Sequence, residues 1–148
     1  MEIREYKEED LKEILNLFYD SVHNTRYYTK EQQDAWASVK EDFLKWNKSF
    51  LEKHTVVVVS ENKILGFGNI DHLGYLDMLY VHKYYQGKGI GNLICDCLET
   101  KFETERIYVH ASIDAKPFFE NRGYKVIKEQ EVLRHGIKLK NYVMEKYK

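Results

Sequence analysis

The most chemically informative stretch of the sequence is a glycine-rich loop between a predicted strand and a predicted helix. The run QGKGIG, residues 86–91, follows an apolar segment at 76–81 and leads into apolar residues at helical spacing. Glycines let the backbone turn sharply and approach a ligand closely. The first N–H groups of a helix lack internal partners and carry the positive end of its dipole, and Lys88 adds a charge. The stretch therefore predicts a site for a phosphate-bearing ligand.

Two common phosphate-binding patterns do not match this loop. A P-loop requires Ser or Thr directly after Gly-Lys, whereas Gly89 follows Lys88 here. The dinucleotide pattern GxGxxG also fails, because the glycines fall at alternating positions. What does match is Q/R-x-x-G-x-G/A, through Gln86, Gly89 and Gly91. The plain alternative is a glycine-rich turn before an ordinary helix, and the order strand, loop, helix favours the ligand site.

This pattern, with the strand residues before it, resembles the acetyl-CoA pyrophosphate loop of the GNAT superfamily of N-acetyltransferases. A second segment, residues 112–124, resembles the family motif N-x-x-A-x-x-F/L-Y-E-x-x-G-F, whose helix lies beside the pantetheine arm of the cofactor. The resemblance spans nearly the whole chain. It implies contacts with acetyl-CoA, the co-substrate, by Leu79, Tyr80, Val81, Gln86, Gly87, Lys88, Gly89, Ile90, Gly91, Asn92, Ser112, Ala115, Phe118 and Phe119.

Three residues depart from the family pattern. Lys83 stands where proline is common, and Ser112 replaces asparagine but keeps a hydrogen-bonding hydroxyl. Phe119 replaces the tyrosine that protonates the departing thiolate in many members. A phenyl ring cannot donate a proton, so the general acid is unassigned. The thiolate can still leave and take a proton from water, because an alkyl thiol in water has a pKa of about 8.5.

The resemblance implies direct attack of an amine on the acetyl thioester in a ternary complex. The backbone N–H groups of Leu79 and Tyr80 would then stabilise the oxyanion. Because an amine with a pKa of about 10.4 is mostly protonated at neutral pH, the reaction needs a base.

Asp77 is the first candidate for this base. On a regular strand it shares a face with Tyr75 and Leu79, and burial would raise its pKa toward a useful range. The alternative is that Asp77 pairs with a lysine or arginine from a neighbouring strand, or faces solvent. His72 is the second candidate, and His110 is a weaker third.

The acceptor is expected to be an amine of a small molecule or peptide, bound by the region between the first two strands. Tyr27, Tyr28, Gln32 and Trp36 are the candidate contacts, and the last three are spaced by four on a predicted helix. Packing of this helix on the sheet explains the same residues equally well.

The elements that must position these residues predict one α/β (α+β) domain over residues 1–148. We expect a mixed sheet of six to seven strands, four to five flanking helices and, from the resemblance, a splayed central strand pair. The expected strands are 2–6, 54–60, 64–71, 76–81, 106–111, 124–134 and 137–146. The expected helices are 8–23, 29–36, one around 43–50, 90–98 and 114–121.

Composition limits the function classes. The net charge of −1 argues against a nucleic-acid or acidic-membrane partner, and no apolar run suits a membrane span or signal segment, so we expect a cytoplasmic protein. Cys95 and Cys97 lack metal-site partners, so we expect no metal, and Cys97 is predicted to be the core cysteine. Association into a homodimer is left open. The alternatives to an N-acetyltransferase are a non-catalytic CoA-binding sensor and a module for another nucleotide.

Overall fold

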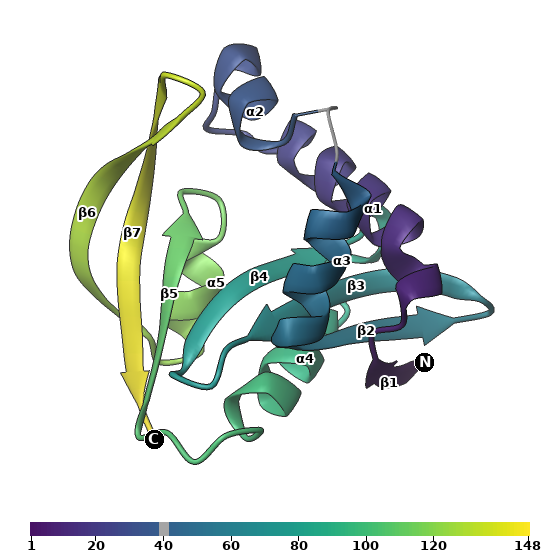
Figure 1. The fold of residues 1–148 in the computed structure, drawn as a ribbon. Coiled ribbons are helices and arrows are strands. Elements are labelled where there is room, and N and C mark those ends of the chain that lie inside the picture. Colours follow the sequence, from purple (N-terminus) through teal and green to yellow (C-terminus); the bar gives the residue numbers. More distant parts are fainter. Residues whose placement is uncertain (39–41) are drawn as a thin grey trace.

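The computed structural model describes residues 1–38 and 42–148, which form a seven-stranded mixed sheet and five α-helices (Figure 1). The strands are β1 (Glu2–Glu5), β2 (His54–Ser60), β3 (Lys63–Ile70), β4 (Tyr75–Val81), β5 (Arg106–Ser112), β6 (Lys125–Arg134) and β7 (Ile137–Tyr147). The helices are α1 (Leu11–His23), α2 (Lys30–Trp36), α3 (Phe43–Glu52), α4 (Ile90–Glu99) and α5 (Lys116–Asn121). Two short 3-10 turns, η1 (Glu8–Asp10) and η2 (Lys83–Tyr85), precede α1 and the glycine loop. The predicted fold class is confirmed.

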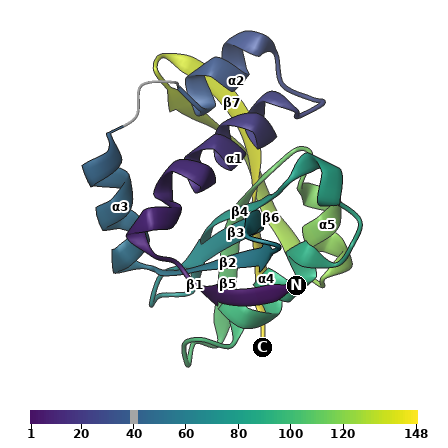
Figure 2. The same cartoon turned by 90° about the vertical axis from the view of Figure 1, so that its right-hand side faces the viewer.

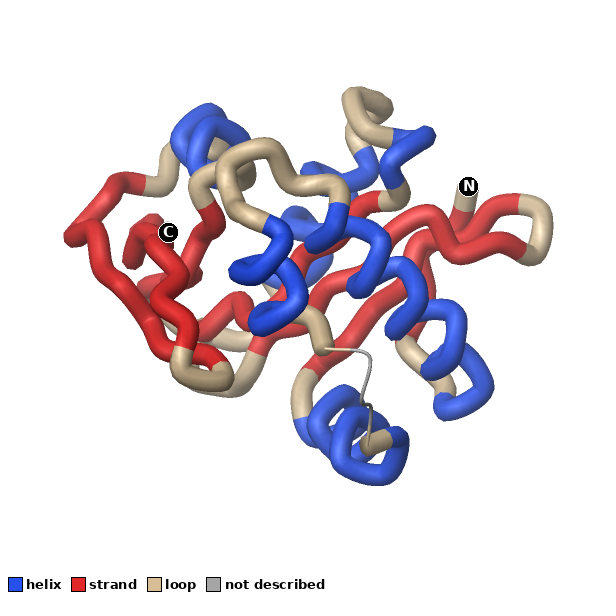
Figure 3. The backbone as a smooth tube through the Cα atoms, turned by 90° about the horizontal axis from the view of Figure 1, so that it is seen from above, coloured by secondary structure: helices blue, strands red, loops and turns tan. Residues whose placement is uncertain are grey.

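The sheet is open between its two central strands. Its order is β1-β2-β3-β4-β5-β7-β6, and β4 and β5 are the parallel neighbours. They pair only at Tyr75 with Tyr108 and at Leu76 with Val109, beyond which the two halves of the sheet diverge (Figure 1, Figure 3). The splayed central pair is therefore present, and it leaves one edge of β4 free of ladder partners after Leu76.

Two apolar cores hold the helices against opposite faces of the sheet, with α1 and α3 on one side and α4 on the other (Figure 2). Gly66 and Gly68 of β3 lie directly beneath α4: a Cβ at Gly68 would come within 2.8 Å of the Ile94 side chain. The two glycines therefore let α4 approach the sheet closely. The helix buries Cys95, while Cys97 is only partly buried, so the expectation about the two cysteines was wrong.

A β-bulge in β4 changes which of its side chains face the α1–α3 side. Asn69 of β3 pairs with Met78 and Ile70 with Leu76, so Asp77 is an additional residue on β4. The Asn69 side-chain oxygen accepts the Met78 N–H at 3.0 Å in place of a regular ladder bond. Because a bulge shifts the alternation of a strand by one residue, Asp77 and Leu79 do not share a face, contrary to expectation.

Candidate active site

Two hollows meet in the opening between β4 and β5. A groove of about 720 Å³ runs along the glycine loop and α5, and a cavity of about 230 Å³ lies between β4, β5, the helices α1–α3 and the β6–β7 hairpin. Trp36, Tyr80 and Ser112 line both. The groove and the cavity are therefore adjacent at this junction.

The loop presents backbone groups to the groove. Gly87 and Gly89 adopt positive φ angles of 75° and 82°, and the space where their Cβ atoms would stand is open. Gly89 caps α4 without a side-chain hydrogen bond, so the N–H groups at the start of the helix are free to bind an anion. Gln86 lines the groove and reaches back to the Val81 carbonyl at 3.4 Å. Lys88 is exposed beside the loop.

The start of α5 forms the opposite wall. Ala115 and Phe118 line the groove, and Ser112 accepts the Ala115 N–H at 3.0 Å. A Cβ at Gly91 would come within 3.0 Å of the Phe118 ring, so a side chain at this position would press into the wall. The open loop and its free amides fit a phosphate-bearing ligand with a narrow arm, as CoA has. Ile90 and Asn92, also expected to contact it, line the groove from the first turn of α4.

Phe119 does not reach the groove. Its ring is 2% exposed and packs edge-on against Phe118 at 5.2 Å and Tyr124 at 5.1 Å. Successive helical residues point about 100° apart, so Phe118 and Phe119 cannot face the same surface. The geometry thus corrects the expected cofactor contact of Phe119, which packs in the core.

The free edge of β4 offers two backbone donors. The N–H groups of Met78 and His82 both bond toward β3, to the Asn69 side chain and the Leu65 carbonyl. Since N–H directions alternate along a strand, Leu79 and Val81 direct theirs toward the opening, whereas that of Tyr80 turns toward β3. Tyr80 instead contributes its side chain, which accepts a hydrogen bond from the Trp36 side chain and whose pKa is raised by burial.

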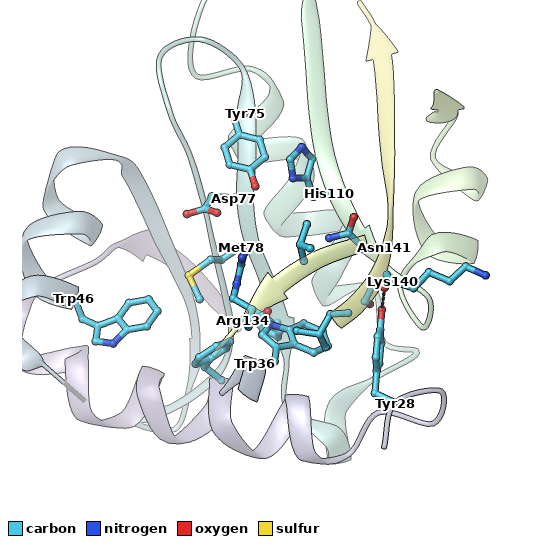
Figure 4. A pocket seen from close by; sticks show the side chains of 15 residues that line it. Tyr28, Trp36, Trp46, Tyr75, Asp77, Met78, His110, Arg134, Lys140 and Asn141 are labelled. Atoms are coloured by element: carbon cyan, nitrogen blue, oxygen red, sulfur yellow. Dashed lines mark hydrogen bonds between the residues drawn. The ribbon is translucent and has the colours of Figure 1, made fainter. Parts of the chain in front are cut away.

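The cavity has an apolar wall and a polar wall (Figure 4). The apolar wall comes from α1, α2, α3 and β4, and the polar wall from β4, β5 and the β6–β7 hairpin. Its main members are Phe18, Tyr28, Trp36, Trp46 and Met78 on the apolar side and Tyr75, Asp77, His110, Arg134, Lys140 and Asn141 on the polar side.

Asp77 lines the cavity but is also paired. Its carboxylate lies 3.3 Å from the Lys53 ammonium at the end of α3, and the two side chains are 31% and 24% exposed. The Tyr75 hydroxyl is directed toward it (Figure 4). The ion pair is the alternative that the sequence had left open for Asp77, with a helix-end lysine as the partner.

The two histidine candidates lie in different places. His72 is exposed in the turn before β4 and lines neither hollow. His110 lines the cavity, with its ring 5.2 Å from that of Tyr75. Burial lowers the pKa of His110, and Lys128 and Arg134 lower it further, whereas Asp77 acts in the opposite direction. His110 is therefore largely neutral at neutral pH and can accept a proton.

Only two of the four residues expected to contact the acceptor line the cavity. Tyr28 and Trp36 form part of the cavity wall, with ring centroids 5.3 Å apart. Tyr27 is 64% exposed and faces the groove instead. Gln32 lines neither hollow; it completes a capping box with Thr29 and donates to the Lys138 carbonyl at 3.0 Å.

The β6–β7 hairpin was not expected to form part of the site. The Tyr28 hydroxyl accepts the Ile113 N–H and donates to the Lys140 carbonyl, which ties the start of α2 to β7. The hairpin thereby brings Arg134 and Asn141 to the cavity. No local pattern marks these residues, because the pairing that places them spans more than 100 residues of sequence.

Comparison with known proteins gives consistent matches. Residues 24–146 match a family model described as "Acetyltransferase (GNAT) domain". YafP of Escherichia coli K12, an uncharacterised N-acetyltransferase, is 32% identical over 97% of this chain and 94% of its own. A GCN5-related N-acetyltransferase structure from Rhodopseudomonas palustris has a TM-score of 0.94 and 30% identity, covering 99% of this chain and 94% of that one. The PaiA N-acetyltransferase of Thermoplasma acidophilum, solved with coenzyme A, has a TM-score of 0.78 at 19% identity, covering 99% and 98%.

Proposed function

The chain belongs to the GNAT superfamily of acetyl-CoA-dependent N-acetyltransferases, and we propose that it transfers the acetyl group to the amine of a small molecule held in the cavity. The observation that carries this proposal is the adjacency of the two hollows. The groove beside the glycine loop and the cavity on the other side of β4 share Trp36, Tyr80 and Ser112. A thioester at this junction lies within reach of an amine from the cavity.

The groove residues bind and orient the co-substrate. The amides of the loop and of the first turn of α4 hold the pyrophosphate, and Phe118 and Ala115 flank the arm. Acetyl-CoA supplies an activated acetyl thioester. The N–H groups of Leu79 and Val81, freed by the divergence of β4 and β5, donate to the carbonyl oxygen as negative charge develops on it.

His110 accepts the amine proton in this proposal. It lies on the same strand as Ser112 and two residues before it, so both point to one face about 7 Å apart along the strand. An amine at the junction beside Ser112 can pass its proton to His110 either directly or through one water. Asp77 influences the pKa of His110 through its charge but is held by Lys53, so we assign it a positioning and electrostatic role.

The transfer balances without a tyrosine at position 119. A protonated amine first gives one proton to His110. The nitrogen then forms a bond to the carbonyl carbon, the carbon–sulfur bond breaks, and the nitrogen gives its second proton to water. The thiolate leaves with the bonding electrons and takes a proton from water, since alkyl thiols in water have a pKa of about 8.5. The buried Phe119 is consistent with this route.

The loop assignment is tested by Gly89→Asp, with Gly136→Asp as its control. Both glycines have positive φ, 82° and 77°, and open space at the Cβ position, but only Gly89 faces the groove. Acetyl-CoA at a hundred times its Kd stabilises a protein by about 2.7 kcal/mol. We expect the resulting rise in Tm to persist in Gly136→Asp and to be lost in Gly89→Asp, where a carboxylate faces the phosphates.

Turnover of acetyl-CoA with a panel of amines completes the test. Acetylated product detected by mass spectrometry supports the proposal. A protein that is stabilised by acetyl-CoA but acetylates no amine is instead a CoA-binding sensor. An equal Tm rise in wild type and in folded Gly89→Asp would remove the loop from the binding site.

A further inference from the structure

The charges of the acceptor cavity are unevenly paired. Asp77 is neutralised by Lys53 at 3.3 Å, and Lys140 by Glu129 at 3.1 Å. Within residues 1–38 and 42–148, Arg134 forms no ion pair, and its guanidinium bonds only to the carbonyl of its neighbour Leu133, at 3.2 Å. The polar wall of the cavity therefore carries an unneutralised cation.

Arg134 lies where its positive charge acts on groups inside the cavity. It ends β6 opposite Ile137, at the tip of the hairpin. Gln32 of α2 and Tyr28, just before α2, hold this hairpin by hydrogen bonds to its backbone carbonyls. The Arg134 side chain lines the cavity together with Tyr75 and His110 (Figure 4), and its charge lowers the pKa of both. A planar guanidinium with free donors suits a carboxylate, which it can bind in a bidentate manner.

The opposite wall selects for an apolar group. Phe18 packs against Trp46 at 5.7 Å and against Tyr80 at 5.1 Å, and Met78 completes this surface. The cavity volume of about 230 Å³ lies below the roughly 300–1,000 Å³ of sites for drug-sized ligands. The site thus fits a small molecule with one anionic and one apolar end.

We propose that the acceptor is a free amino acid with an apolar or aromatic side chain, whose carboxylate binds Arg134. This inference rests on the proposed function and names its substrate class. The side chain lies against Phe18, Trp46 and Met78, and the amine points to the junction at Ser112 and His110. A polyamine, by contrast, brings further positive charge next to Arg134, and a peptide N-terminus lacks the adjacent carboxylate.

The test compares substrates that differ only in the carboxylate. L-Phenylalanine, L-phenylalanine amide and 2-phenylethylamine are assayed with wild type, Arg134→Gln and Lys138→Gln, together with spermidine. Lys138 is an exposed residue of the same hairpin that lines neither hollow, so its replacement controls for loss of one positive charge. Rates are taken on the pH-independent plateau of each variant, because Arg134 also affects His110.

We expect wild type and Lys138→Gln to favour the free amino acid over its amide in kcat/KM by roughly 10- to 100-fold, as charged hydrogen bonds allow. In Arg134→Gln this ratio should fall to about one, whatever the change in overall rate, and Arg134→Lys should restore part of it.

Three results would overturn the inference: equal use of acid and amide by wild type, a preserved ratio in Arg134→Gln, or acetylation of spermidine alone. Each leaves the acetyltransferase activity standing. Absence of both acetyl-CoA binding and turnover of any amine is a different result, which would remove the proposed function itself.

Discussion

The groove and the cavity meet at three residues, yet they are built in different ways. The groove comes mainly from one contiguous stretch, the end of β4, the glycine loop and the start of α4, with α5 as its far wall. A ligand in the groove meets mostly backbone N–H groups and the open space beside glycines that have no side chain. The cavity collects side chains from α1, α2, α3, β4, β5, β6 and β7.

This difference determines what each region tolerates. A backbone site depends on local conformation, so it constrains glycines and leaves most other residue types open. A side-chain site depends on which elements the fold brings together, and its chemistry changes with single residues. In the proposed function, the groove therefore defines the common reaction, and the cavity defines which amine takes part in it.

The strongest test of this division is His110→Gln, because it changes the cavity and leaves the groove intact. General base catalysis contributes about 10²–10⁴-fold, so we expect kcat/KM to fall by roughly that factor. The Tm rise with acetyl-CoA should stay as in wild type, since His110 lines only the cavity.

The matched control is His72→Gln. His72 is a histidine of the same sheet region and is exposed, as His110 is, but it lines neither hollow. Its replacement should leave kcat/KM unchanged. A large loss of activity in His72→Gln would make His72 the base. Full activity in His110→Gln would mean that His110 is not the base.

A second prediction tests the border between the groove and the core at α5. Phe119→Tyr adds a hydroxyl to a ring that is 2% exposed and packed between Phe118 and Tyr124. A buried hydroxyl without a partner costs about 1–3 kcal/mol, so Tm should fall by several degrees and turnover should not rise.

Phe118→Tyr is the neighbouring control for this change. Phe118 lines the groove, so its added hydroxyl can reach solvent, and the loss of stability should be clearly smaller. If Phe119→Tyr were as stable as wild type and also faster, the ring edge would face the thiol, as the family resemblance had implied.

The same contrast explains what could be predicted from the sequence. The helix and strand periods, the Thr29 cap and the loop glycines are local signals, and they located the elements and the groove. The bulge at Asp77 has no local signal, because it depends on how Asn69 of another strand replaces a ladder bond. That single inserted residue changed which side chains of β4 face the cavity.

The hairpin contribution was missed for a related reason. Arg134 and Asn141 lie in strands that look unremarkable along the chain, since β6 is mostly exposed and both strands carry many charged residues. They reach the cavity because β5 leaves β4 and carries β7 and β6 with it toward α2. His110 is a weak candidate in the sequence for the same reason.

The smallest expected effect concerns the charge on Asp77. Its carboxylate raises the pKa of His110 against the lowering by burial and by Lys128 and Arg134. In Asp77→Asn that opposition is lost and Lys53 is left unneutralised, so the pKa of His110 falls further. A base works in its neutral form, so the acidic limb of the kcat/KM profile should move to lower pH. On the plateau the rate should change by less than about tenfold, because interactions between partly exposed charges are screened.

Glu52→Gln serves as the control, since it removes a negative charge from the same end of α3 outside the cavity. Its profile should overlay that of wild type. The direction of the shift in Asp77→Asn separates the two roles open to this carboxylate. If Asp77 itself took the amine proton, Asp77→Asn would lose activity at every pH, because asparagine cannot accept the proton. If the acidic limb moves and the plateau is preserved, His110 is the group that accepts the amine proton, and Asp77 acts by changing the pKa of His110.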